Sequence, residues 1–139
     1  MANEATCIET PSRFGIYTIA AGAVLPKGTL CYLSSDPHTV AATSADDQSF
    51  AGIVWDMASS ATSTETRITL ALDGVWDIKA TAAANVLGEA LAIGGANLVV
   101  TADAADLLNG AFIGFLEETQ ASSEVCRTRL TKFGSSGQL

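Results

Sequence analysis

Short apolar runs separated by turn-forming residues fill most of the chain. The runs FGIYTIA (14–20), TLCYL (29–33) and FAGIVWD (50–56) are rich in β-branched and aromatic residues, a composition typical of strands. LPKG (25–28) places Pro shortly before Gly between two of these runs, which favours a turn. SEVCRTRLTKF (123–133) predicts a last strand. The pattern therefore predicts an all-β chain.

The remaining runs predict hairpins and at most one short helix. In RITLALDGVWDIKA (67–80) an Asp-Gly pair separates two apolar runs, which predicts a hairpin, while a corner or bulge within one long strand fits the same pattern. EALAIGGANLVVTA (89–102) predicts a hairpin with GGAN at its tip. We expect a helical turn in TAAANVLG (81–88), and a loop or single turn in DAADLLNG (103–110).

The second half of the chain repeats the pattern of the first half. Four segments keep their order at a spacing of about sixty residues: KGTLCYL (27–33) with LGEALAI (87–93), HTVAAT (38–43) with LVVTAD (98–103), FAGIVWD (50–56) with FIGFLEE (112–118), and TETRITL (64–70) with VCRTRL (125–130). This order predicts a small β-barrel or β-sandwich built from two similar β-units. Gly52 and Gly114 fall mid-strand, which predicts a bend or a close backbone approach.

Length and charge narrow the classes of protein that fit. At 139 residues we expect a polar N-terminal arm (1–15), a single β domain (16–133) and a flexible C-terminal tail (134–139). Seven basic residues stand against fifteen acidic ones, a net charge of −8, which argues against nucleic acid as a partner. No apolar run is long enough to span a bilayer and no signal peptide is recognisable, so no membrane partner is predicted.

The candidate chemical groups do not combine into a catalytic or metal motif. Cys7, Cys31 and Cys126 have no CxxC spacing and are odd in number, which predicts free thiols in a reducing cytoplasm. His38 is the only histidine, too few for a histidine zinc site or a triad. The acidic pairs do not match a calcium loop, and we expect them to be solvated: Asp46/Asp47, Asp103/Asp106 and Glu117/Glu118.

Two enzyme-related alternatives stay open. A paired-carboxylate hydrolase is an alternative that no spacing favours, because sequence does not give distances between strands. The fragment DIKA (77–80) is similar to the modified-lysine hairpin of lipoyl and biotin carrier domains, with Lys79 as the lysine. We predict no catalysis, no metal and no cofactor.

The order of the segments resembles tailed-bacteriophage capsid decoration, or cement, proteins. The resemblance covers roughly residues 16 to 131 and rests on Gly and apolar positions in these segments: IAAGAVLPKGTLCYL, FAGIVWD, ITLALDGVWDIKA, NVLGEALAIGGANLVVTA, AFIGFLEE and VCRTRL. The chain departs from the family pattern at Glu89-Ala90-Leu91, where the family often has Asp followed by a β-branched or aromatic strand.

The resemblance implies a structural virion protein rather than an enzyme. The family implies a β-tulip-like barrel, a homotrimer, and binding to the major capsid protein on the capsid exterior, after synthesis in the host bacterial cytoplasm. The runner-up interpretation is another β-structural module of a phage tail or fibre.

Five residues are candidates for the contact surface. Ile8, Pro11 and Phe14 are the anchors of the N-terminal arm, which we expect either to add a strand to a neighbour's sheet or to be disordered. Trp55 and Trp76 are rare large side chains and are candidates for core anchors or interface residues.

Overall fold

The computed structural model describes residues 3–20, 23–35, 38–46, 48–56, 67–81, 88–118 and 125–131. These residues form eleven strands and one short helix, which confirms the all-β prediction. The elements are β1 (Thr6–Glu9), β2 (Phe14–Thr18), β3 (Leu30–Ser35), β4 (Thr39–Ala42), β5 (Phe50–Val54), β6 (Arg67–Ala71), β7 (Val75–Ala80), β8 (Ala90–Gly95), β9 (Leu98–Thr101), α1 (Ala104–Asn109), β10 (Phe112–Leu116) and β11 (Val125–Leu130).

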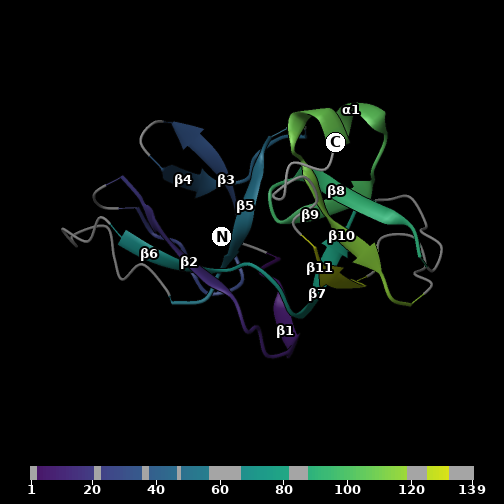
Figure 1. Ribbon diagram of the computed structural model, residues 1–139, viewed down its shortest axis with the longest axis horizontal. Helices are drawn as coiled ribbons and strands as arrows, with labels where there is room; N and C mark the ends of the chain where they lie inside the picture. The colour runs from purple at the N-terminus through teal and green to yellow at the C-terminus, as the bar shows by residue number, and fades with distance from the viewer. Residues whose placement is uncertain are drawn as a thin grey trace.

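The strands close into two small barrels of five strands each, which stand side by side in Figure 1. The first barrel has the order β2-β4-β3-β5-β6 and the second has β7-β11-β10-β8-β9. In each barrel one pair is parallel, β2 with β4 and β7 with β9, and the other pairs are antiparallel. Each predicted β-unit therefore closes a barrel of its own.

The two barrels repeat one another down to the strand register. In β3–β4 the paired residues are Cys31–Ala42, Leu33–Val40 and Ser35–Thr39, and in β8–β9 they are Leu91–Thr101, Ile93–Val99 and Gly95–Leu98, with the same irregularity before the last pair. The loop hydrogen bonds repeat too: Leu33 N to Ser49 O matches Ile93 N to Ala111 O, and Val54 N to Thr29 O matches Leu116 N to Glu89 O. The repeat predicted from the sequence is therefore confirmed.

Gly52 and Gly114 occupy equivalent places in this repeat. A Cβ atom at Gly52 would meet the carbonyl oxygen of Ala71, and one at Gly114 would meet the carbonyl oxygen of Arg129. Ala71 and Arg129 are themselves equivalent, on β6 and β11. The predicted close backbone approach is confirmed at both positions, because only a residue without Cβ leaves room there.

Two hydrophobic clusters fill the molecule. One lies inside the first barrel and contains Tyr17, Val40 and Leu70. The other fills the second barrel and also takes in outward side chains of the first, including Leu30 and Ile53. The barrels are therefore joined by a shared apolar core, which hydrophobic burial stabilises.

A buried asparagine also joins the two barrels by hydrogen bonds. Asn97, at the tip of the β8–β9 hairpin, is 1% exposed. Its Oδ1 accepts from Leu30 N at 2.9 Å, and its own N–H donates to Thr43 Oγ1 at 3.1 Å. Its φ of 57° is one that Asn tolerates better than most residues. The hairpin predicted for residues 89–102 is confirmed, and its tip is an inter-barrel contact.

The hairpin predicted at Asp73-Gly74 is wrong, and so is the alternative of one long strand: the chain turns a corner there between two separate strands. β6 pairs with β2 and β5, whereas β7 pairs with β1, β9 and β11, so the two strands belong to different barrels. Gly74 has a φ of 98°, which lets the chain turn sharply between them. The Asp73 carboxylate accepts hydrogen bonds from Ser12 N and Oγ at 2.8 Å each and from Arg13 N at 3.1 Å.

The N-terminal arm pairs with its own chain. β1 lies antiparallel to β7, with Thr6 opposite Asp77 and Cys7 opposite Trp76. Within residues 3–13 the arm is therefore neither disordered nor added to a neighbour's sheet, because an edge of the chain's own second barrel accepts it.

The one described helix does not lie in residues 81–88, the segment for which the sequence predicts a helical turn. Residues 82–87 of that segment lie outside the described part, as does the predicted tail at 134–139. The helix is α1, of six residues, where a loop or single turn was expected. Asp103 and Asp106 explain its start: Asp106 Oδ2 accepts from Asp103 N at 2.9 Å and Asp103 Oδ1 from Asp106 N at 3.0 Å, a reciprocal capping arrangement.

Candidate functional site

Three aromatic side chains form a line from the core to the surface. Trp76 is fully buried, Trp55 is half-buried and Phe14 is 44% exposed. The ring centroids of Trp76 and Trp55 are 6.2 Å apart and nearly perpendicular, and those of Trp55 and Phe14 are 5.6 Å apart. Edge-to-face and tilted pairs at these distances are favourable. The exposed Phe14 side chain therefore packs on Trp55, which in turn packs on the buried Trp76.

Polar contacts hold the two indoles in this line. Trp76 Nε1 donates to the carbonyl oxygen of Asp73 at 3.2 Å, so its buried N–H is satisfied. Lys27 Nζ lies 3.7 Å from the centroid of the Trp55 ring, a cation–π contact. Trp76 is therefore a core anchor, while Trp55 is part core and part surface.

The outer face of the first barrel continues the exposed apolar surface along β2. Side chains alternate along a strand, so Tyr17 points inward and is buried, while Phe14 and Ile16 point outward at 44% and 59% exposure. Thr69 of β6 lies opposite Ile16. We call Phe14, Ile16 and the exposed part of Trp55 the apolar face.

The equivalent face of the second barrel is charged and ion-paired. Asp77 of β7 corresponds to Ile16, and its carboxylate pairs with Arg127 at 3.1 Å. Arg127 also lies 3.3 Å from Glu118, while Arg129 lies 2.9 Å from Glu117 and 3.3 Å from Glu9. The hydrogen bonds that Arg127 donates to the Asp77 carboxylate raise the pKa of Arg127, and those that Arg129 donates to Glu117 raise the pKa of Arg129. Similar backbones thus present an apolar face on one barrel and a polar face on the other.

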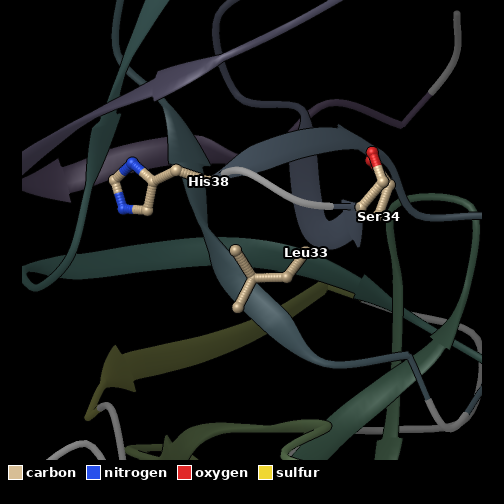
Figure 2. A pocket seen from close by; sticks show the side chains of 4 residues that line it. Leu33, Ser34 and His38 are labelled. Carbon is tan, nitrogen blue, oxygen red and sulfur yellow. The ribbon is translucent and has the colours of Figure 1, made fainter.

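A surface hollow of about 390 Å³ is lined by Leu33, Ser34, Ser35 and His38. Figure 2 shows the side chains of Leu33, Ser34 and His38 around it. The His38 ring stacks on Tyr17 with centroids 4.3 Å apart, and Ser34 Oγ donates to Thr39 O at 3.3 Å. No carboxylate is among the described lining residues, so they offer the imidazole no acidic partner for proton transfer.

A second hollow, of about 330 Å³, lies between the arm and the second barrel. Its described lining residues are Asn3, Glu4, Thr6, Asp77, Lys79 and Val125. Asp77 there is already paired with Arg127. Lys79 lies within strand β7, not at the tip of a hairpin as in the lysine of a carrier domain.

The thiols and acidic groups form no metal site in the part of the chain that the structure describes. No group of three or more His, Cys, Asp or Glu side chains is placed to hold a metal ion there. None of the three cysteines is in a disulfide. Burial raises the pKa of the Cys31 thiol to about 12, and burial, opposed by Lys27, raises that of Cys7. The thiols of Cys7 and Cys31 are therefore poor nucleophiles near neutral pH.

The structure brings together three of the five candidate contact residues. Phe14, Trp55 and Trp76 form the aromatic line, whereas Ile8 lies on β1 at 41% exposure and Pro11 is buried beside Gly74. Sequence reasoning missed Ile16 and Lys27. Ile16 is two positions after Phe14 in the same strand, so the period-2 pattern carried a signal for it. The contact of Lys27 with Trp55 joins loops distant in sequence, and no local pattern predicts it.

The chain was compared with protein-family models and with curated proteins, and these comparisons add nothing to the description of its fold and surface. Neither a protein-family model nor a curated protein sequence matches it. Within the described ranges no helix has the length and apolar character needed to cross a membrane. The chain is thus an all-β protein of two five-stranded barrels, with an apolar face on the first barrel and an ion-paired face on the second.

Proposed function

We propose that the chain is a structural virion protein that binds the outer surface of an assembled phage capsid and cements neighbouring major capsid subunits. The observation that carries the proposal is the apolar face, where Phe14 and Ile16 are 44% and 59% exposed on a strand of a closed barrel. Exposed apolar side chains grouped on a rigid element mark contact surfaces. The order of sequence segments, which resembles capsid decoration proteins, supports the same proposal.

The physical demands of cementing agree with this surface. A cement protein needs a stiff body and contact area, not a reaction centre. The shared core and the buried Asn97 join the two barrels, so force on one barrel passes to the other. A homotrimer, which belongs to this proposal, would present three copies of the apolar face. Several weak contacts then add up to strong attachment.

A β-structural module of a phage tail or fibre is the second candidate. It is favoured by the same apolar face, since such a module also works by contact. The two candidates differ in the assembly to which the face binds. A carrier domain is disfavoured by the position of Lys79 within β7, because the modified lysine must project from a turn to reach its enzymes.

The test is binding to expanded empty shells of the phage that encodes the chain. We would first measure the mass of the purified protein by light scattering, then mix it with shells and measure bound protein and the temperature of shell disruption. Saturable binding at a fixed number per hexameric unit, with a raised disruption temperature, is the expected result. A folded protein that ignores shells but binds tails would favour the second candidate.

A matched pair of variants assigns the binding to the apolar face. Ile16→Thr removes apolar surface from an outward position that is 59% exposed, and Val125→Thr does the same at an outward position of β11 that is 51% exposed. Both place a β-branched polar residue in a strand, so their folding costs are comparable. We expect Ile16→Thr to weaken shell binding about tenfold, the effect of losing roughly 1.4 kcal/mol, and Val125→Thr to leave it unchanged.

A further inference from the structure

One surface hollow lies at a fork between strands of the second barrel. β1 is antiparallel to β7, with Thr6 opposite Asp77. Two positions further along β7, the partner of Lys79 is Leu98 of β9. The edge of β7 therefore changes its partner strand between Asp77 and Lys79. The hollow of about 330 Å³ lies at this change, with Thr6, Asp77 and Lys79 among its lining residues.

The loop before β3 draws the arm away from β7 at this point. Ala5 N donates to the carbonyl oxygen of Gly28 at 2.8 Å. Gly28 has a φ of 93°, and a Cβ atom there would come within 3.1 Å of Glu4 Cβ, so the arm fits because this residue has no side chain. The antiparallel register of Thr6 would continue with Glu4 opposite Lys79. The turn toward Gly28 instead leaves these two side chains in the lining of the hollow.

The two opposite charges in this lining are both unpaired. Among the described residues neither the Glu4 carboxylate nor the Lys79 ammonium makes a hydrogen bond or an ion pair, with each other or with a third group. Asp77 differs, because Arg127 donates to both of its carboxylate oxygens at 3.1 Å. Glu4 Oε2 is buried without a donor, which is rare in folded proteins. Oε1 is the atom left to meet a donor from the hollow.

The charges around the hollow select the kind of molecule that fits it. A simple cation drawn to Glu4 would be repelled by Lys79, and a simple anion drawn to Lys79 would be repelled by Glu4. A molecule that carries both charges is attracted at both ends. Asn3 and Thr6 add an amide and a hydroxyl to the lining, each able to donate and accept. Val125, opposite Lys79 on β11 and 51% exposed, supplies an apolar wall.

We propose that this hollow binds a small zwitterion, a molecule with an ammonium group and a carboxylate joined by a short hydrocarbon chain. The ammonium group donates to Glu4, the carboxylate accepts from Lys79 Nζ, and the hydrocarbon lies on Val125. A volume of about 330 Å³ is in the range of small-molecule sites. Because Glu4 belongs to the arm and Lys79 to the barrel, the ligand ties one to the other. This binding goes beyond the proposed cement function and needs no capsid.

Titration calorimetry with whole zwitterions and with their halves tests the proposal. The full chain is titrated at low ionic strength with glycine, β-alanine and γ-aminobutyrate, and separately with n-butylamine and with butyrate. We expect the best zwitterion to bind at least about tenfold more tightly than either half, a difference of about 1.4 kcal/mol. Added salt should weaken this binding, because it screens the charges on both molecules.

Two variants assign the binding to the two charges. Glu4→Gln and Lys79→Met each remove one charge and keep a side chain of similar length, and each should weaken zwitterion binding at least about tenfold. Neither charge is paired within the described part of the chain, so neither variant should lower the urea midpoint of unfolding. Asp46→Asn, at an exposed loop position of the first barrel, is the control and should bind the zwitterion as the wild type does.

Three results would overturn the proposal. If no zwitterion binds more tightly than its halves, the hollow does not recognise both charges. If n-butylamine binds as tightly as γ-aminobutyrate, the site takes a cation and Lys79 has no part in it. If both variants bind the zwitterion as the wild type does, the ligand lies elsewhere on the protein. Each result leaves the cement function untouched, because that function is tested by binding to shells.

Discussion

Gly114 lies directly against the carbonyl oxygen of Arg129 on the neighbouring strand β11, where a Cβ atom has no room. The same relationship exists between Gly52 and Ala71 in the first barrel. A recurring contact of this kind lets two backbones approach more closely than a side chain permits. It is therefore a sensitive place to test the internal repeat.

Replacing Gly114 with Ala should destabilise the protein by about 2–4 kcal/mol, because the added methyl group must push the β11 backbone aside. Gly52→Ala should act in the same direction. Gly88→Ala is the control: it has open space around its Cβ position and a φ of 88°, so its cost should be about 1 kcal/mol, from backbone strain alone. Urea unfolding measures all three. A Gly114→Ala cost no larger than that of Gly88→Ala would contradict the close approach.

Trp76 and Phe14 should differ strongly in their contribution to folding. Trp76→Ala leaves a cavity at a fully buried site and should cost about 3–5 kcal/mol. Phe14→Ala, at 44% exposure, should cost about 1 kcal/mol. Denaturant unfolding gives both values. If Phe14→Ala were as damaging as Trp76→Ala, Phe14 would be a core residue and the apolar face would lose its main member.

Asp73 should make stability depend on pH in the acid range. Burial acts to raise the pKa of its carboxyl, but hydrogen bonds from Ser12 and Arg13 outweigh it and the pKa lies below its usual value. A lowered pKa means that the stabilisation is present above the unfolded pKa of about 3.9 and is lost as pH falls through the folded pKa.

Asp73→Asn should remove this dependence and cost about 1–2 kcal/mol at pH 7, the loss of charge-assisted hydrogen bonds. The measurement is unfolding free energy at several pH values from 7 downward, for wild type and variant. The difference between them should shrink below about pH 4. Asp46→Asn is the control at an exposed loop position, and a constant difference for Asp73→Asn at all pH values would contradict the argument.

The three thiols should differ in reactivity according to burial. Cys31 and Cys126 are buried and Cys7 is partly exposed, so a thiol reagent at pH 8 should label the native protein at one site and the unfolded protein at three. Cys7→Ser should abolish native labelling, while Cys126→Ser should leave it unchanged. Rapid labelling of two or three thiols in the native protein would contradict the described packing.

The particular elements show how far sequence reasoning reaches in this protein. The repeat of Gly52 at Gly114 and the β8–β9 hairpin were predicted because strand pattern and turn chemistry are local. The Asp-Gly pair at 73–74 misled for the same reason: its local chemistry is that of a hairpin, but β6 and β7 find their partners in different barrels. The sequence singled out Phe14 and the two tryptophans, which lie together in the structure, and their role as contact residues stays a prediction.

The amino-acid sequence by itself determined that the chain is all-β, that its units are two, and which side chains alternate along each strand, since these follow from patterns within a few residues. Only the tertiary structure decided that each unit closes its own barrel and that β1 pairs with β7, whereas no described strand pairs with the equivalent part of β2 at Phe14 and Ile16. The physical reason is that every strand offers the same N–H and C=O groups. Which edges meet depends on how distant apolar faces pack, and no local pattern contains that choice.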